Sequence, residues 1–312
     1  MQSTSNILMI RPANFGYNPE TASSNYFQKN TEPGGKHSIQ ELALNEFENF
    51  VKLLKNKDIN VVVFDDTPTP TKPDAVFSNN WVTFHKNGTV VLYPISAENR
   101  RTERRVDIIE DLRKNFKIKN IIDLTRFEKE NRFLEGTGSI VFDHLFRFSY
   151  ASLSSRTDKN LFVELSMELG YHPIYFNAKD EKGKELYHTN VMMCISEQFA
   201  IICSESIKNP TEQKLVTDIL KNTGREIIEI SLKQLKLFAG NMLSVKTHDG
   251  NNLLIMSEKA HSSLDESQLG NITKYNEILV VPLNTIETIG GGSVRCMMTE
   301  IFLPELLLNL VY

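Results

Sequence analysis

Short apolar segments follow small or polar residues at a nearly constant interval along the chain. Five such segments are Ser78–Phe84, Gly136–Phe142, His188–Cys194, Ala239–Val245 and Gly291–Met297. Their anchors are spaced by 58, 52, 51 and 52 residues and lie at Asn80, Gly138, Asn190, Asn241 and Ser293. A recurring interval of this length predicts several copies of one supersecondary unit.

The sequence between the anchors predicts the same elements in each unit. Asn87–Gly88 and Asp249–Gly250 suit hairpin tips, because glycine adopts positive φ. Returning strands are predicted at Thr89–Tyr93, Arg147–Ala151, Ala200–Ser204 and Asn252–Met256. Segments with helical periodicity follow at Asn99–Phe116, Thr157–Gly170, Thr211–Thr223 and Ser263–Thr273. Closing strands are predicted at Asn120–Leu124, Pro173–Phe176, Glu226–Ile230 and Glu277–Val281.

The two ends of the chain complete a fifth unit. Ile7–Ile10 and Val61–Phe64 are predicted strands, and Ile39–Lys57 is a predicted amphipathic helix. Pairing of Ile7–Ile10 with a strand near Cys296 would close a ring and remove exposed sheet edges. We therefore predict one α/β domain, residues 1–312, folded as a five-bladed propeller of ββαβ units. The alternative is an α/β protein of two ordinary domains; the near-constant interval favours the ring.

Composition and charge narrow the class of protein. Of 312 residues, 40% are hydrophobic and 24% charged, as in a soluble globular protein. The formal net charge of −4 predicts no basic surface for nucleic acid. No apolar run approaches the ~18 residues of a membrane span, and no secretory signal is visible. We expect a cytoplasmic protein with neither nucleic-acid nor membrane partners.

Reactive side chains lie beside the anchors. Glu135, His188 and Cys296 are each within three residues of one, and equivalent positions of radially arranged units converge at one end of the axis. A thiolate nucleophile, an imidazole that moves protons and an orienting carboxylate together suit nucleophilic catalysis. The other two cysteines, Cys194 and Cys203, lie in apolar strand segments and are expected in the core. With no CxxC or HxxxH pair, the sequence predicts no metal site.

Four motifs in this order resemble those of the guanidino-group-modifying superfamily: Phe77–Asn80, Phe133–Gly136, His188–Asn190 and Gly290–Cys296. That superfamily includes arginine deiminases, dimethylarginine dimethylaminohydrolases and amidinotransferases. The resemblance covers nearly the whole chain and implies the pentein fold, a five-bladed α/β propeller, with no cofactor. It implies that Cys296 is the nucleophile and His188 the general acid and base. Glu135 would then hold a substrate nitrogen and the histidine.

The resemblance also implies residues that bind the substrate. Phe77 would pack on the planar group that reacts. Arg156, in the run Ser154–Thr157, would bind the substrate carboxylate, and Arg101 is a second, weaker candidate. The sequence leaves open which segment covers the site; Ala13–Pro33, rich in Asn, Ser and Gly, is one candidate.

Asn80 and Asn190 stand where arginine deiminases have aspartates. Those carboxylates pair with a guanidinium cation, whereas asparagine carries no charge. The change favours a neutral ureido group, and Asn79–Trp81 also resembles the branch of citrulline-utilisation hydrolases. Asp74 or Asp143 could still supply a carboxylate, which leaves arginine open.

The sequence thus predicts a cofactor-free, cysteine-dependent hydrolase of C–N bonds. Its partner would be a small amino acid, citrulline first and arginine or a derivative next. An amidinotransferase and a non-catalytic pentein binding protein remain as alternatives. The combination of Cys, His and Glu favours the enzyme. The oligomeric state stays open, a homo-oligomer included.

Overall fold

The computed structural model of the chain describes residues 1–31 and 38–306, and within them the strands form five three-stranded sheets. One sheet contains β1 (Asn6–Arg11), β2 (Asn60–Asp65) and β15 (Thr299–Glu300). The other four contain β3 (Val82–Phe84), β4 (Thr89–Leu92) and β5 (Asn120–Asp123); β6 (Val141–Asp143), β7 (Phe148–Ser152) and β8 (His172–Phe176); β9 (Met193–Ile195), β10 (Phe199–Ile202) and β11 (Glu226–Glu229); and β12 (Leu243–Lys246), β13 (Asn252–Ser257) and β14 (Glu277–Val281). Each middle strand pairs antiparallel with one neighbour and parallel with the other.

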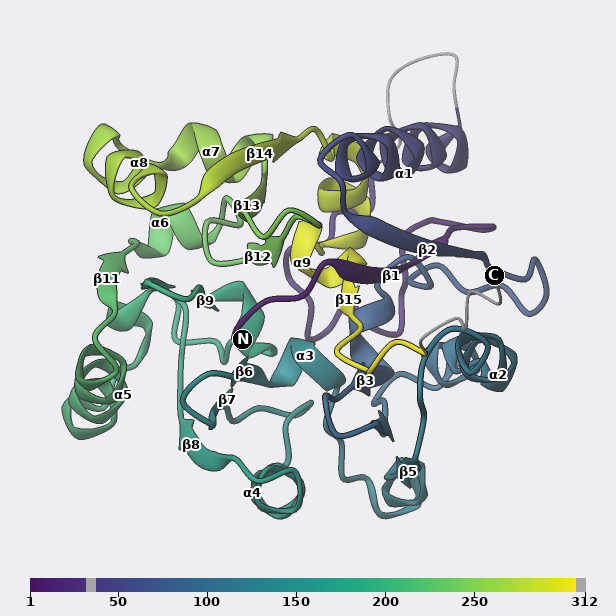
Figure 1. The fold of residues 1–312 in the computed structure, drawn as a ribbon, viewed down its shortest axis with the longest axis horizontal. Helices are drawn as coiled ribbons and strands as arrows, with labels where there is room; N and C mark the ends of the chain where they lie inside the picture. Colours follow the sequence, from purple (N-terminus) through teal and green to yellow (C-terminus); the bar gives the residue numbers. More distant parts are fainter. Residues whose placement is uncertain (32–37, 307–312) are drawn as a thin grey trace, which may run out of the picture.

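Helices connect each middle strand to its parallel neighbour, as a parallel pair requires. These helices are α1 (Ile39–Lys55), α2 (Val106–Leu112), α4 (Lys159–Glu168), α5 (Pro210–Asn222), α7 (Glu258–Ser263) and α8 (Glu266–Thr273). They lie around the outside of the ring, with the sheets inside (Figure 1). Shorter helical segments in the connections are η2 (Asn99–Glu103), η3 (Thr125–Glu130), η5 (Ser204–Ser206) and α6 (Leu232–Leu235).

Helix α1 shows how sequence sets these outer elements. Ser38 and Glu41 form a capping box at its start, which satisfies backbone N–H groups that the helix leaves unpaired. The buried side chains recur at helical spacing and form one apolar stripe: Ala43, Phe47, Phe50, Val51 and Leu54. Among the described residues, no helix combines the length and the apolar character needed to cross a membrane.

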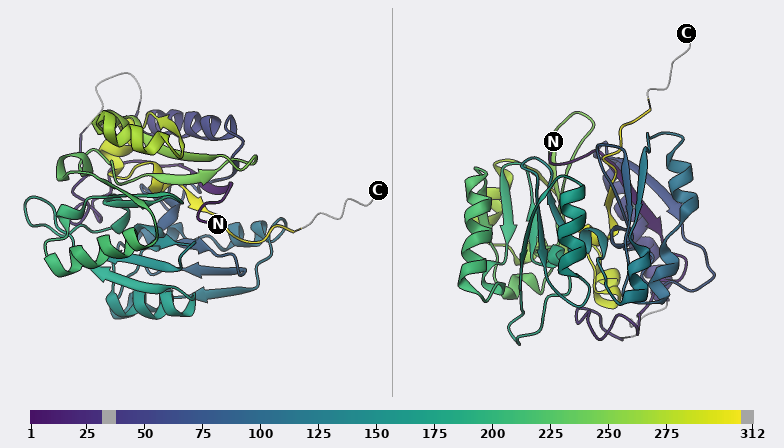
Figure 2. Two further views of the ribbon diagram at one scale, coloured as in Figure 1. Left: turned by 60° about the vertical axis from the view of Figure 1, so that its left-hand side comes forward. Right: turned by 90° about the horizontal axis from the view of Figure 1, so that it is seen from below.

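The two ends of the chain share one sheet. β1 pairs antiparallel with β15, with Leu8 opposite Thr299, and parallel with β2. This pairing confirms the predicted ring of five ββαβ units, seen from two sides in Figure 2. The predicted helix Asn99–Phe116 instead divides into η2 and α2. Arg104 and Arg105 between them are extended, and Arg104 pairs with Glu128 of η3.

The anchor segments differ from the expectation that they enter strands directly. A single helical turn precedes the strand in four units: η1 (Ser78–Asn80), α3 (Gly136–Ser139), η4 (Thr189–Val191) and α9 (Val294–Met297). A π-helical turn, η6 (Ile286–Gly290), leads toward α9. α3 and α9 lie near the centre of the ring in Figure 1. Cys296 therefore lies in a helical turn, and the strand expected near it begins only at Thr299.

Candidate active site

A small cavity lies where the central turns meet. Its lining comes from several blades and from the N-terminal loop: Asn25, Asp74, Phe77, Asn80, Arg100, Arg156, Tyr187, His188, Gly290, Gly291, Gly292 and Cys296. The volume of about 20 Å³ holds roughly one water molecule. The structure thus brings the cysteine and the histidine to one cavity, from turns 108 residues apart in the chain.

The carboxylate of Glu135 lies beside that cavity and contacts the histidine. Its Oε2 is 2.8 Å from His188 Nε2 and accepts from Arg156 Nη1 at 3.4 Å, while Oε1 accepts from Ser96 N at 3.0 Å. Glu135 and His188 each directly precede a one-turn helix, α3 and η4. Equivalent positions of two repeats therefore place the two side chains together.

Burial and charge set the protonation states of this pair. Burial alone would raise the pKa of Glu135, but the charge of Arg156 and the contact with His188 hold that pKa below its ordinary value. Burial lowers the pKa of His188 to about 4, against the opposing effect of Glu135. A neutral imidazole beside an anionic carboxylate can accept a proton, as a general base must.

The thiol of Cys296 is almost fully buried. Asn241 Nδ2 lies 3.3 Å and Asn190 Nδ2 3.8 Å from its Sγ. Burial raises the pKa of the thiol, while the backbone of Ser293, these two amides and the charge of Arg295 oppose that shift.

Glycines make the close approaches in this site possible. A Cβ on Gly138 would lie 2.7 Å from the His188 ring and 2.8 Å from Asn80 Oδ1. A Cβ on Gly290 or Gly292 would lie 2.7 or 2.6 Å from the ring of Phe77. Phe77 therefore packs against the loop that leads to Cys296, and only glycine leaves room for it there.

Two carboxamides present unused acceptors in the buried site. Asn80 Oδ1 and Asn190 Oδ1 are both buried without a hydrogen-bond partner. A buried acceptor left unpaired costs about 1–3 kcal/mol, so a bound ligand with N–H donors would be favoured there. Asn80 and Asn190 are also the two positions at which arginine deiminases have aspartate.

Of the two predicted substrate-binding arginines, Arg156 lines the cavity and Arg101 does not. Arg101 donates to the carbonyl oxygens of Ile95 and Ser96 and is partly exposed. Its neighbour Arg100 points inward instead, because Glu103 holds it through two hydrogen bonds of 2.8 and 2.9 Å. Of the run Arg100–Glu103, the arginine that lines the cavity is thus Arg100 and not the expected Arg101.

The N-terminal loop, within the candidate segment Ala13–Pro33, contacts the cavity and supplies Asn25 to its lining; Glu32 and Pro33 lie outside the described residues. Ser24 Oγ accepts from Arg156 Nη2 at 2.5 Å, and Asn25 Nδ2 donates to Gly290 O at 3.1 Å. Asn18 Nδ2 donates to Asp74 Oδ2 at 2.7 Å. These contacts join the loop to both sides of the site.

Sequence reasoning missed several groups at the site. Asn241 is one of the repeat anchors, and the equivalence of anchor positions that selects its neighbours also predicts that it lies near Cys296. Arg100 and Tyr187 adjoin predicted residues but carried no signal of their own. Asp143, considered as a source of charge, pairs with Arg225 at 2.6 Å and does not line the cavity.

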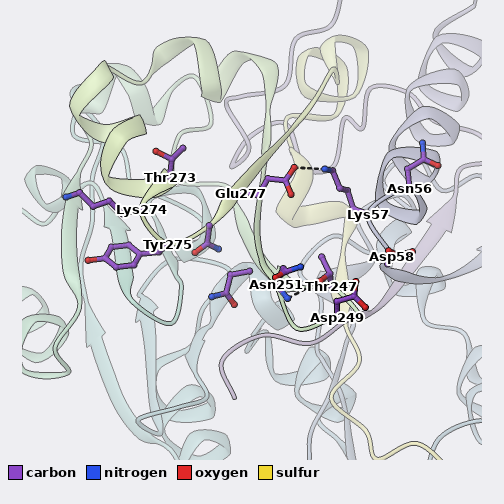
Figure 3. Close-up of a pocket in the computed structure, with 12 residues that line it drawn as sticks. Asn56, Lys57, Asp58, Thr247, Asp249, Asn251, Thr273, Lys274, Tyr275 and Glu277 are labelled. Carbon is purple, nitrogen blue, oxygen red and sulfur yellow. Dashed lines mark hydrogen bonds and ion pairs between the residues drawn. The ribbon is translucent and has the colours of Figure 1, made fainter.

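Two larger hollows lie elsewhere. One is an open polar groove between Asn56–Asp58 and Thr273–Glu277, where Lys57 pairs with Glu277 (Figure 3). The other, of about 840 Å³, is lined by the chain's first residues, the hairpin tips and Ile301–Glu305. Neither is lined by a cysteine. In the described part of the chain, no group of three or more His, Cys, Asp or Glu side chains could hold a metal ion.

Comparison with known proteins finds one matching family model and several solved structures with the same fold. The model of a family described as N,N dimethylarginine dimethylhydrolase, eukaryotic, matches residues 11–303. The apo structure of ArgZ, an arginine dihydrolase from the ornithine-ammonia cycle in cyanobacteria, is similar at 17% identity and a TM-score of 0.73 over 97% of this chain. This chain covers only 41% of that protein.

Two further structures show the same fold. The substrate-bound N-terminal domain of ArgZ is 17% identical with a TM-score of 0.72, and the match covers 96% of this chain and 98% of the domain. A dimethylarginine dimethylaminohydrolase adduct with S-methyl-L-thiocitrulline is 16% identical with a TM-score of 0.65, covering 96% of this chain and 100% of that one. No curated protein matches the chain.

Proposed function

The chain belongs to the N,N-dimethylarginine dimethylhydrolase family, hydrolases of the pentein superfamily, and from that premise we propose that it is a cysteine-dependent hydrolase of a ureido or guanidino amino acid, with citrulline as the favoured substrate. The observation that carries the proposal is the shared cavity of Cys296 and His188, with Glu135 hydrogen-bonded to the histidine. These three groups supply a nucleophile, a proton carrier and its orienting anion.

The charges around the cavity support a neutral reacting group. Glu135 is already paired with Arg156, and Asp74 lies 3.7 Å from Arg100. A substrate guanidinium would add a third cation beside two buried arginines, whose charges Glu135 and Asp74 already balance. A ureido group brings no charge, and its N–H groups suit the free oxygens of Asn80 and Asn190.

The other charged groups suit the amino-acid end of such a substrate. Asp74 Oδ1 is buried and has no partner, so it can accept from an α-ammonium. Arg156 can bind the α-carboxylate, because the loop contacts of its guanidinium through Ser24 and Thr21 can be exchanged for the ligand. A cavity of about 20 Å³ is too small for an amino acid, so binding requires the N-terminal loop to move away from Arg156 and Gly290.

The reaction then runs in two steps. The Cys296 sulfur attacks the ureido carbon while His188 takes the thiol proton; the C–NH2 bond breaks and ammonia leaves with that proton. The product is an S-linked thiocarbamate. Water, deprotonated by His188, adds to its carbon and the C–S bond breaks. The carbamate of ornithine that is released loses carbon dioxide to give ornithine.

Arginine dihydrolysis is the second candidate, because the ArgZ structures share the fold and are described as those of an arginine dihydrolase. Product ratios separate the candidates. Citrulline hydrolysis gives one ammonia per ornithine, arginine dihydrolysis gives two, and deimination gives ammonia with citrulline but no ornithine. An amidinotransferase would release ornithine from arginine only when an acceptor amine is present.

The test is a panel of L-citrulline, L-arginine, dimethylarginine and agmatine, with ammonia, ornithine and citrulline measured together. The expected result is the highest kcat/KM for citrulline with a ratio of one, and no product with Cys296→Ala. A higher kcat/KM for arginine overturns the ureido assignment. No product from any of the four contradicts the proposed hydrolase.

A further inference from the structure

The side chains of Asn190 and Asn241 both contact the sulfur of Cys296, and that of Asn241 is the nearer. We propose that Asn241 is a catalytic residue whose amide N–H stabilises the thiolate that forms when Cys296 gives up its proton. The inference deepens the proposed function, since it rests on Cys296 as the nucleophile. It concerns the resting enzyme, however, and can be tested without any substrate.

The orientation of the Asn241 amide follows from its neighbours. Its Oδ1 accepts from Arg295 N at 3.1 Å, and its Nδ2 donates to Asn190 O at 3.2 Å. The reverse orientation would set an oxygen against the carbonyl of Asn190 and an NH2 group against the N–H of Arg295. The NH2 group must therefore face Sγ, at 3.3 Å.

The contacts of the sulfur favour its anionic form. Asn241 and Asn190 both aim N–H donors at Sγ, and a thiolate is the better acceptor. A neutral thiol could donate its proton to Asn241 Oδ1 at 3.7 Å, but that oxygen already accepts from Arg295 N. Loss of the proton leaves both N–H donors paired with the sulfur.

The other charged and titratable groups near the sulfur do not stabilise the thiolate in place of the Asn241 amide. Arg295 is next in the chain, but its guanidinium is held by Met298 O and Glu300 at 2.9 Å. His188 is neutral near pH 7, because burial lowers its pKa. The other groups that face the cavity are Tyr187, Arg156, Arg100 and Asp74, with Glu135 behind them, and their charges pair largely among themselves.

The experiment measures how fast iodoacetamide alkylates Cys296 as a function of pH. Peptide mass spectrometry separates this site from Cys194 and Cys203. The midpoint of the curve reports the pKa of the thiol, whereas the plateau at high pH reports access beneath the loop. Burial raises the pKa of this thiol and the Asn241 amide opposes that rise, so the wild-type midpoint is the reference against which each variant is read.

Asn241→Asp is the sharpest variant. It keeps the oxygen that accepts from Arg295 N and replaces the donor with an anion beside the sulfur. The midpoint should rise by at least about one pH unit, which is a tenfold slower alkylation at a fixed pH below both midpoints. The plateau should stay unchanged. A folded Asn241→Asp with the wild-type midpoint overturns the inference.

Two further variants separate this effect from a general loss of structure. Asn276→Asp makes the same change at another buried asparagine of the same blade, where the amide donates to Ser244 Oγ and not to Cys296; its midpoint should be that of the wild type. Asn241→Ser removes the donor without adding charge and should also raise the midpoint. It decides the question if Asn241→Asp does not fold. Because no substrate is used, these outcomes do not depend on whether citrulline is turned over.

Discussion

Replacing Glu135 with glutamine tests the charge at the centre of the site. The variant keeps the shape of the side chain but removes its anion. Glutamine has one acceptor oxygen in place of two, so it cannot serve Ser96 N, Arg156 and His188 together. Arg156 is then left buried without a counter-ion, and His188 without the anion that orients it.

The structure gives the size of both effects. Removing one partner of a buried ion pair costs about 3–5 kcal/mol, and because Arg156 also donates to Ser24 and Thr21 we expect a loss near the lower end, about 3 kcal/mol. Without the orienting anion, His188 transfers protons less effectively, and the reaction should be about 10²–10⁴-fold slower. The two losses have separate measurements.

The stability loss should also depend on pH. Arg156 and His188 hold the pKa of Glu135 below its unfolded value of 4.5, so its stabilising effect is present above that pH and fades as the pH falls through the native pKa. Unfolding by urea at pH 7 and at pH 4 should therefore show a smaller difference between variant and wild type in acid.

Glu128→Gln is the matched control. Glu128 likewise accepts from a backbone N–H, that of Ile95, and from an arginine, Arg104, but it lies outside the cavity. We expect this variant to lose stability and keep the rate of ammonia release. The reasoning is refuted if Glu135→Gln matches the wild type in its free energy of unfolding, or if its activity is no lower than that of Glu128→Gln.

Three further outcomes follow from the same geometry. Asn80→Asp places a carboxylate by the reacting group and should raise the ratio of kcat/KM for arginine to that for citrulline at least about tenfold; an unchanged ratio would show that this position does not select charge. Burial lowers the pKa of His85 from 6.5 to about 3, so the native state resists protonation that the unfolded state accepts, and stability should fall by about 2 kcal/mol between pH 6.5 and 5. His85→Gln should remove close to one proton from that slope in urea unfolding, and an identical slope would contradict the assignment. Ser24→Ala removes one of the two acceptors that Arg156 finds in the loop, leaving Thr21 O, and should raise the plateau rate of Cys296 alkylation by roughly 2–10-fold; a plateau at the wild-type rate would show that the Ser24 contact does not hold the loop closed.

Most of the fold could be predicted from the repeat along the sequence. Because the interval between anchors is nearly constant, it located the hairpins, the outer helices and the closing of the ring by β1 and β15. It could not show the helical turns at the anchors, since a turn of three or four residues leaves no periodic pattern. Cys296 was therefore expected near a strand and lies in α9.

Candidate site residues could be predicted where the type of the side chain by itself indicates reactivity. Cys296, His188 and Glu135 stood out because thiol, imidazole and carboxylate are reactive and lie at repeated positions. Arg100 could not be told from Arg101 by sequence: both lie in one short run, and the ion pair with Glu103 that turns Arg100 inward exists only in the folded chain.

The most direct test of the account is to look for the covalent intermediate on Cys296. The enzyme is mixed with L-citrulline, quenched in acid during turnover, digested and analysed by mass spectrometry. The account predicts a peptide containing Cys296 that carries the thiocarbamate, with unmodified Cys194 and Cys203, and neither adduct nor ornithine with Cys296→Ala. Ornithine released by Cys296→Ala at the wild-type rate would contradict it.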